Sequence, residues 1–132
     1  MTLGKSRARV LALLVAATSC GILAPDDLVC LTIPVDGILI YVKDSATRAW
    51  AASGAHFTAR SGDYVDSTTY PSRFPLGDSL PMRAASGQAG IFSVTVRKEG
   101  YRDWTRTGIW VGTNKCGEPR TVTVTALLQR PL

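Results

Sequence analysis

Residues 91–98, with the sequence IFSVTVRK, alternate apolar and polar side chains more regularly than any other stretch of the chain. Side chains on a β-strand point to opposite faces in turn, so Phe92, Val94 and Val96 are expected to face a core. In residues 121–128 (TVTVTALL), the apolar positions 122, 124, 126 and 128 share one face in the same way. These two stretches predict half-buried strands of an all-β domain.

The remaining strands are predicted from composition and from turn signals. The continuous apolar run at 38–42 (ILIYV) predicts a strand in the middle of a sheet, covered on both faces. Residues 55–60 and 64–70 flank the turn residues Gly62 and Asp63, which predicts a β-hairpin. Three further segments complete the pattern: a short edge strand at 82–85, a strand within 101–111, and a long proline-rich loop at 71–81.

The size and composition of the chain allow one small domain. It has 132 residues, of which 45% are apolar and 19% are charged. This is sufficient for a single hydrophobic core and argues against a disordered chain.

The first nineteen residues have the pattern of an export signal. Lys5, Arg7 and Arg9 precede an apolar run at 10–17, which is shorter than the roughly 20 residues of a transmembrane helix. Residues 17–20 (ATSC) resemble a bacterial lipobox, although an alanine stands where a bulky aliphatic residue is usual. The alternatives are an ordinary secretory signal, cut near Ser19, and a buried amino-terminal helix.

We therefore expect a lipoprotein-type signal peptide with a signal helix at 1–19, lipidation at Cys20, a tether at 20–29 and a domain at 30–130. Gly21 follows Cys20 where an Asp often retains lipoproteins at an inner membrane. A cell-envelope location is expected, with the outer membrane favoured if the host has two membranes.

The number of cysteines, three, is consistent with a lipoprotein signal followed by one disulfide. If Cys20 carries lipid, Cys30 and Cys116 remain and can form a disulfide in an oxidising compartment. Two separate buried thiols are the alternative. The bridge would close a loop of 86 residues, taken as 116 minus 30, and would contribute roughly 4 to 5 kcal/mol.

The charge of the chain gives no indication of a nucleic-acid partner. The formal net charge is +5, but removal of Lys5, Arg7 and Arg9 leaves 12 basic against 10 acidic residues. The remaining cations are scattered and form no stripe that could follow a phosphate backbone.

Two stretches resemble carboxypeptidase regulatory-like domains. Residues 90–96, followed by Gly100 and Tyr101, match that family's pattern of a glycine, an aromatic residue, alternating valines and Gly-Tyr. Residues 42–47 (VKDSAT) resemble its first strand and the turn that leaves it. The resemblance spans about 30–128. It implies a seven-stranded transthyretin-like Greek-key β-sandwich, in which the first and last strands can run parallel and bring the two cysteine-bearing ends together. An immunoglobulin-like sandwich would give much of the same pattern.

The resemblance implies a structural or adhesive role. Hydroxyisourate hydrolases, which are related to transthyretin, rely on several His and Arg residues and on a Tyr-Arg-Gly-Ser carboxyl terminus. This chain has one histidine, His56, and ends in QRPL, which excludes that activity. His56 is also the only imidazole that could serve a catalytic serine, so we predict no enzyme, no cofactor and no metal centre. The spacing of Asp63, Asp66 and Asp78 is not diagnostic of calcium, and turn formation and solvation explain them.

Aromatic residues support a second hypothesis. Tryptophans in so small a domain are expected in the core, and Tyr101 is expected at a structural corner. Tyr64 and Tyr70, beside the proline-rich loop, are the candidate ligand platform. The leading hypothesis is a non-catalytic, lipid-anchored envelope module, whose partners are the membrane and an envelope protein or glycan. The alternative is a carbohydrate- or peptide-binding module that uses exposed aromatic side chains.

Overall fold

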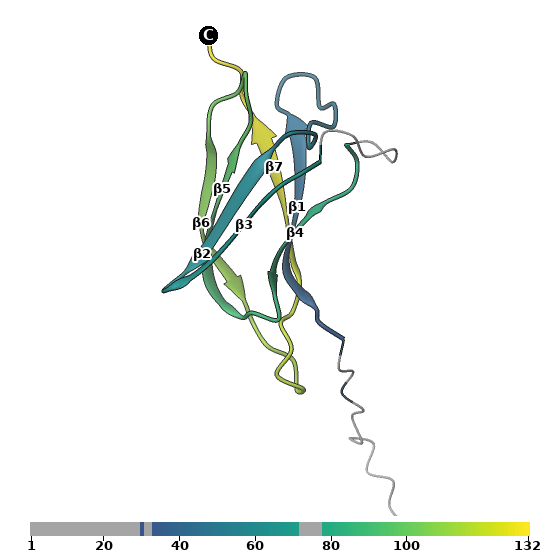
Figure 1. Cartoon of the computed structure of the whole chain (residues 1–132), viewed down its shortest axis with the longest axis vertical. Helices are drawn as coiled ribbons and strands as arrows, with labels where there is room; N and C mark the ends of the chain where they lie inside the picture. The colour runs from purple at the N-terminus through teal and green to yellow at the C-terminus, as the bar shows by residue number, and fades with distance from the viewer. Residues whose placement is uncertain (1–29, 31–32, 72–77) are drawn as a thin grey trace, which may run out of the picture.

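The computed structural model describes residues 30, 33–71 and 78–132, which fold into seven strands and no helix (Figure 1). The predicted signal peptide and the whole tether, including Cys20, lie outside the described residues, as does part of the predicted proline-rich loop. The strands are β1 (Asp36–Asp44), β2 (His56–Ser61), β3 (Tyr64–Thr69), β4 (Met82–Ser86), β5 (Gly90–Arg97), β6 (Trp104–Val111) and β7 (Val122–Leu128).

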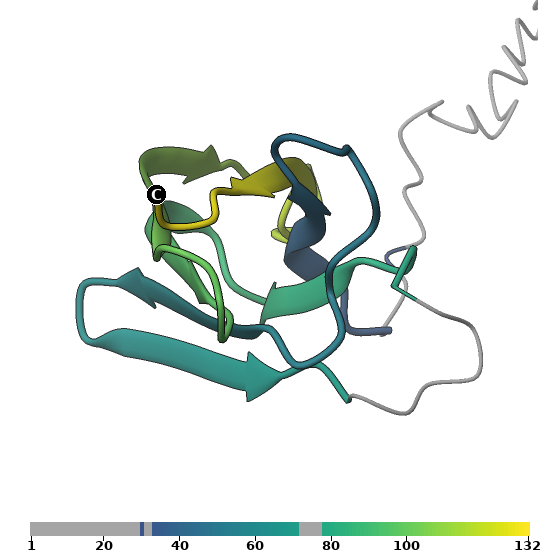
Figure 2. The ribbon, with the colours of Figure 1, turned by 90° about the horizontal axis from the view of Figure 1, so that it is seen from above.

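The strands form two sheets, one with the order β4-β1-β7 and the other with the order β3-β2-β5-β6. Seen from above, the β2–β3 hairpin and the β1–β7 pair lie on opposite sides of the molecule (Figure 2). The predicted hairpin is confirmed by antiparallel pairing of His56 with Thr69 through to Ser61 with Tyr64. The predicted edge position of β4 and the central position of β1 are also confirmed.

The first and last strands pair in parallel. Their register runs from Ile38 opposite Val122 to Asp44 opposite Leu128. Parallel neighbours cannot be joined by a tight turn, so the rest of the domain forms the connection between them. This pairing agrees with one feature that the family resemblance implied.

The inner faces of the two sheets form the core. Phe92, Val94 and Val96 are 1%, 0% and 0% exposed, which confirms the alternation predicted for β5. The predicted inner face of β7 is also buried, except for Val122 at its start, which is half-buried. Other large buried side chains come from β1 and β2: Ile38, Ile40, Val42 and Phe57.

Two expectations about burial were wrong. Strand β1 is fully covered on one face only, because Leu39 and Tyr41 on its other face are half-buried. The tryptophans are not all in the core: Trp104 packs against it, but Trp50 is 42% exposed and Trp110 is 72% exposed. In β6 the residues on either side of Trp110 are buried, so strand alternation turns its side chain outward.

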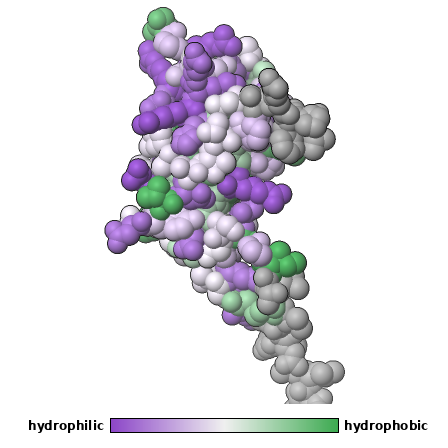
Figure 3. Space-filling model, viewed as in Figure 1, coloured by the Kyte–Doolittle hydropathy of each residue, from purple (hydrophilic) through white to green (hydrophobic). Residues whose placement is uncertain are grey.

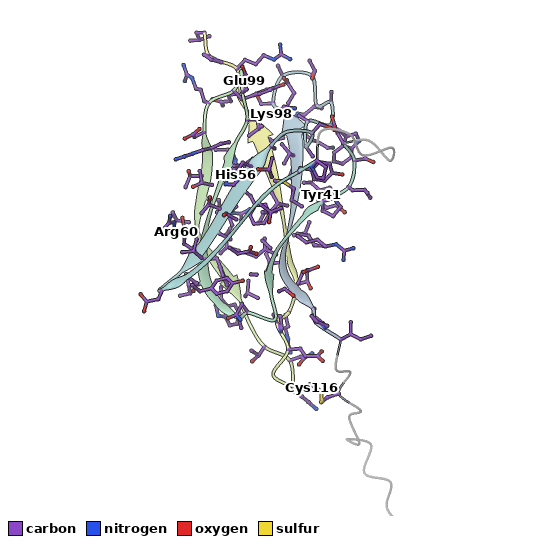
Figure 4. All side chains as sticks on the ribbon, in the orientation of Figure 1. Tyr41, His56, Arg60, Lys98, Glu99 and Cys116 are labelled. Carbon is purple, nitrogen blue, oxygen red and sulfur yellow. A yellow bond between two sulfur atoms is a disulfide. The ribbon has the colours of Figure 1, made fainter. Side chains whose placement is uncertain are left out.

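A disulfide joins Cys30 to Cys116, with Cα atoms 5.6 Å apart, as predicted. Cys30 precedes β1 and Cys116 precedes β7, so the bridge connects the entrances to the two parallel strands. Figure 4 shows Cys116 at one end of the molecule, and Figure 1 shows the carboxyl terminus at the opposite end.

A β-bulge interrupts the pairing of β5 with β6. The register shifts between Phe92 and Val94, and Gly108 has a φ of 67°. Side chains other than glycine are strained in this left-handed region, so a glycine is required where the extra residue is accommodated. Beyond the bulge, Ile91 pairs with Trp110, and both side chains point away from the core.

Candidate functional site

The outer face of the four-stranded sheet is polar and carries no acidic side chain from its strands. The pairings Thr58 with Ser67, Thr58 with Thr95, and Thr95 with Thr105 place four hydroxyl side chains in one row across all four strands. The Oγ1 atoms of Thr95 and Thr105 are 3.1 Å apart. A row of this kind offers both donors and acceptors to a polar ligand.

An exposed apolar pair lies on the same face, at the end nearer the disulfide. Ile91 and Trp110 are directly opposite each other on β5 and β6, and are 65% and 72% exposed. Surface apolar residues are ordinary when scattered singly, but an exposed tryptophan beside an exposed isoleucine forms a small apolar patch. In the view of Figure 3, which shows only one side of the molecule, hydrophobic residues on the surface are isolated.

The indole of Trp110 lies against the backbone of Gly112. A Cβ placed on Gly112 would be 3.3 Å from both Cζ2 and Cη2 of the ring and 3.8 Å from Cε2. These are three consecutive atoms of the ring. If the Cβ approached the ring in the plane of the indole, Cε2 would be about one bond length farther away than the other two atoms, but the observed distances are much more similar than that. Gly112 therefore lies under one face of the ring, and the high exposure of the indole leaves the other face open to solvent.

The charged side chains that the strands themselves place on this face are cationic. Arg60 pairs with Val65 on β3 and Ser93 on β5, and its side chain has no hydrogen bond or ion pair with the described residues. Arg97 is paired with Asp103, with Nε and Oδ2 3.1 Å apart. Figure 4 shows Arg60 and His56 along β2, with Tyr41 on the other side of the molecule.

His56 has a structural partner. Its Nδ1 lies 2.9 Å from the Oγ1 of Thr69 on the neighbouring strand. His56 is thus held on the outer surface of the sheet by a contact with the strand beside it.

A second aromatic group, Trp50 with Tyr41, lies beside the three-stranded sheet, but a lysine lies over the indole. The Nζ of Lys43 is 4.2 Å from the ring centroid of Trp50, and the Tyr41 ring is 5.7 Å from that ring. A lysine over the indole gives a cation–π contact that a ligand would have to displace. Trp110 has no such contact among the described residues, so it is the better candidate for ligand stacking.

The predicted platform at Tyr64 and Tyr70 does not agree with the burial of these rings. Tyr70 is 8% exposed, and Tyr64 packs edge to face against Phe92 with centroids 6.1 Å apart. Burial, and secondarily the charge of Asp66, raises the pKa of Tyr64 above its ordinary value. Strand alternation decides this outcome, because Tyr64 is on the inward side of the hairpin.

The three aspartates considered for calcium do not gather. Asp66 Oδ2 accepts a hydrogen bond from the Ala85 backbone N–H at 2.9 Å, and Asp78 accepts hydrogen bonds from Ser53. Asp63 lies in the turn between β2 and β3. In the part of the chain that the structure describes, no three His, Cys, Asp or Glu side chains are grouped as metal ligands.

A charge cluster around the buried carboxylate of Asp44, at the end opposite the disulfide, is structural. Asp44 is 4% exposed; its Oδ1 accepts from the backbone N–H groups of Ala46 and Thr47 at 2.8 and 2.9 Å. Its Oδ2 accepts from the Tyr101 hydroxyl at 2.9 Å and from Arg130 Nε at 3.2 Å. The Thr47 backbone N–H and then the Tyr101 hydroxyl hold the pKa of Asp44 well below its usual range.

This cluster joins the end of β1, the loop between β5 and β6, and the carboxyl-terminal segment. It gives Tyr101 the structural role that the sequence predicted. A cavity of about 530 Å³ lies beside it, lined in part by Asp44, Arg102 and Arg130. Because Asp44 and Arg130 satisfy each other, we assign the cluster to folding rather than to ligand binding.

Comparison with known proteins gives no identification. No protein-family model, curated protein or solved structure matches the chain. Within residues 30, 33–71 and 78–132, no helix has the length and apolar character needed to span a bilayer. The described residues therefore define a class only: an all-β, sandwich-like domain of seven strands in two sheets, with one disulfide.

Proposed function

We propose that this protein is an exported, lipid-anchored and non-catalytic module of the bacterial cell envelope. The observation that carries the proposal is the Cys30–Cys116 disulfide, because such bridges persist in oxidising compartments and are rare in the cytosol. It follows a leader that ends in Cys20, and it uses the two cysteines that lipidation would leave over. The three cysteines then each have a role.

We further propose that the domain is a transthyretin-like sandwich of the carboxypeptidase regulatory-like type. The parallel pairing of β1 with β7 supports this assignment, since sandwiches of that type can place their first and last strands side by side in the same direction. The bridge between the entrances of these strands is consistent with the same arrangement.

The working surface of the module is the outer face of the four-stranded sheet. A lipid anchor on Cys20 leaves nine residues before Cys30, which reach at most about 30 Å when extended. The domain would then remain close to the membrane, where other envelope components are its partners. The exposed Trp110 and the row of hydroxyl groups favour binding over catalysis.

Metabolic labelling tests the anchor. Cells that produce the native protein are labelled with radioactive palmitate in parallel with cells that produce the Cys20→Ser variant. The proposal predicts label in the native protein alone. Equal labelling of both proteins, or labelling of neither, would overturn it.

A further inference from the structure

We propose that the outer face of the four-stranded sheet binds an acidic polysaccharide, with a pyranose ring stacked on Trp110 and a carboxylate or phosphate group paired with Arg60. This inference rests on the proposed binding role of that face and names its ligand class. Three observations carry it: the open indole face, the guanidinium without a partner among the described residues, and the hydroxyl groups between and beside them.

One face of the Trp110 indole is available for stacking. Gly112 supports one ring face, and Ile91 opposite extends the apolar surface in the same plane of the sheet. A tryptophan side chain has only two torsions, so little rotamer freedom is lost when a ligand stacks on the ring. Flat apolar surfaces of this size suit the CH-bearing face of a sugar ring.

Arg60 supplies charge complementarity. Arg60 on β2 pairs with Ser93 on β5, which is two residues along that strand from Ile91. Ile91 in turn pairs with Trp110 on β6, so Arg60 and Trp110 are two strands apart and two residues apart along the strands. With strands about 4.8 Å apart and a rise of about 3.4 Å per residue, the Cα atoms of Arg60 and Trp110 are separated by about 12 Å. A disaccharide can bridge that distance. A free guanidinium matches carboxylate and phosphate geometry with two parallel hydrogen bonds.

The hydroxyl groups favour a glycan over a lipid surface. Ser93, Thr95 and Thr105 would lose water against acyl chains without gaining partners, which is costly for buried polar groups. Sugar hydroxyls can instead donate to and accept from them. The apolar area at Ile91 and Trp110 is also small for membrane insertion, which leaves the acidic glycan as the occupant.

Binding is tested with the oxidised protein purified from the cell envelope. The probes are a panel of acidic pyranose polymers (polygalacturonate, alginate and hyaluronan), the neutral polymer galactan, the ringless polyanion polyphosphate, and phosphatidylglycerol vesicles. We expect at least one acidic polymer to bind roughly tenfold more tightly than galactan or polyphosphate, with an affinity that falls as salt is added. Failure of every acidic polymer to bind, or equal binding of polyphosphate or vesicles, would overturn the inference.

Variants at exposed positions locate the site without unfolding the protein. Trp110→Ala and Arg60→Gln are each expected to weaken binding about tenfold, and Gly112→Ala is expected to weaken it by moving the indole from its support. Trp50→Ala and Arg48→Gln are the matched controls, since they remove an exposed ring and an exposed cation elsewhere, and they should bind as the native protein does. Unchanged binding in Trp110→Ala or Arg60→Gln would place the ligand elsewhere and overturn the inference.

A cross-linking arm separates this inference from the proposed function. A photoreactive amino acid at position 91 is activated in living cells. Cross-linking to a protein, with no glycan binding in the titrations, would refute the glycan and leave the binding face in place. Neither glycan binding nor any cross-link would refute both the glycan and the assignment of this face as the working surface, whereas the lipid anchor is tested separately by the palmitate labelling.

Discussion

Replacing both Cys30 and Cys116 with serine should destabilise the domain severely. The bridge closes a loop of 86 residues and links the entrances to β1 and β7, the only parallel pair among the described strands. Without it, the unfolded chain regains the freedom that the closed loop removes. The chain before β1 also loses its covalent link to the loop that leads into β7.

The expected loss in the free energy of unfolding follows from the length of the loop that the disulfide closes. The chain-entropy model gives about 4.6 kcal/mol at 25 °C for an 86-residue loop. A domain of this size has a total stability of about 5 to 15 kcal/mol, so the loss would be a third or more of the whole. At about 4 °C or more for each kcal/mol, the midpoint of thermal unfolding should fall by roughly 20 °C.

Urea denaturation measures the effect, with tryptophan fluorescence as the signal and the Cys20→Ser variant as a control that keeps the bridge. The double variant should unfold at a much lower urea concentration, and reducing agent should destabilise the native protein but not the variant. A change in the free energy of unfolding below about 1 kcal/mol would refute the reasoning, because the loop would then be held by other contacts.

Three other changes test the fold. Phe92→Ala should lower the free energy of unfolding by about 3 to 5 kcal/mol in urea titrations, because it opens a cavity in the core; a loss below about 1 kcal/mol would place that ring outside the core. Gly108→Ala should lower it by about 1 kcal/mol through backbone strain alone, and no loss would contradict the positive φ. Folding lowers the pKa of Asp44, so the stability that this carboxylate gives is present above about pH 4 and is lost as the pH falls. The Asp44→Asn variant should therefore unfold more easily than the native protein at pH 7 and lose less stability on acidification. Parallel profiles of unfolding free energy against pH for the two proteins would contradict this.

The strands were predictable because their patterns are local. Alternation in β5 and β7 and the turn residues between β2 and β3 identify each element without knowledge of its neighbours. The parallel pairing and the disulfide depend on residues more than eighty positions apart. They were predicted from the family resemblance and from the cysteine count, and the structure confirms both features.

The candidate site was harder to predict, because it depends on which way each aromatic side chain points. Tyr64 and Tyr70 were chosen for their position beside a loop, yet both are wholly or partly buried. Trp110 was assigned to the core because tryptophan is large and apolar. The signal that could have identified it is the alternation of Ile109, Trp110 and Val111, which allows only one side of the strand to be buried. The support from Gly112 depends on a rotamer that no local pattern indicates.

The intact mass of the protein isolated from its own cells tests the central claim most directly. We predict a chain that begins at Cys20, heavier than its sequence by a lipid group, with no thiol that reacts with iodoacetamide before reduction and two that react afterwards. A chain that retains the leader, or one with a reactive thiol before reduction, would contradict an exported, lipid-anchored and disulfide-bridged module.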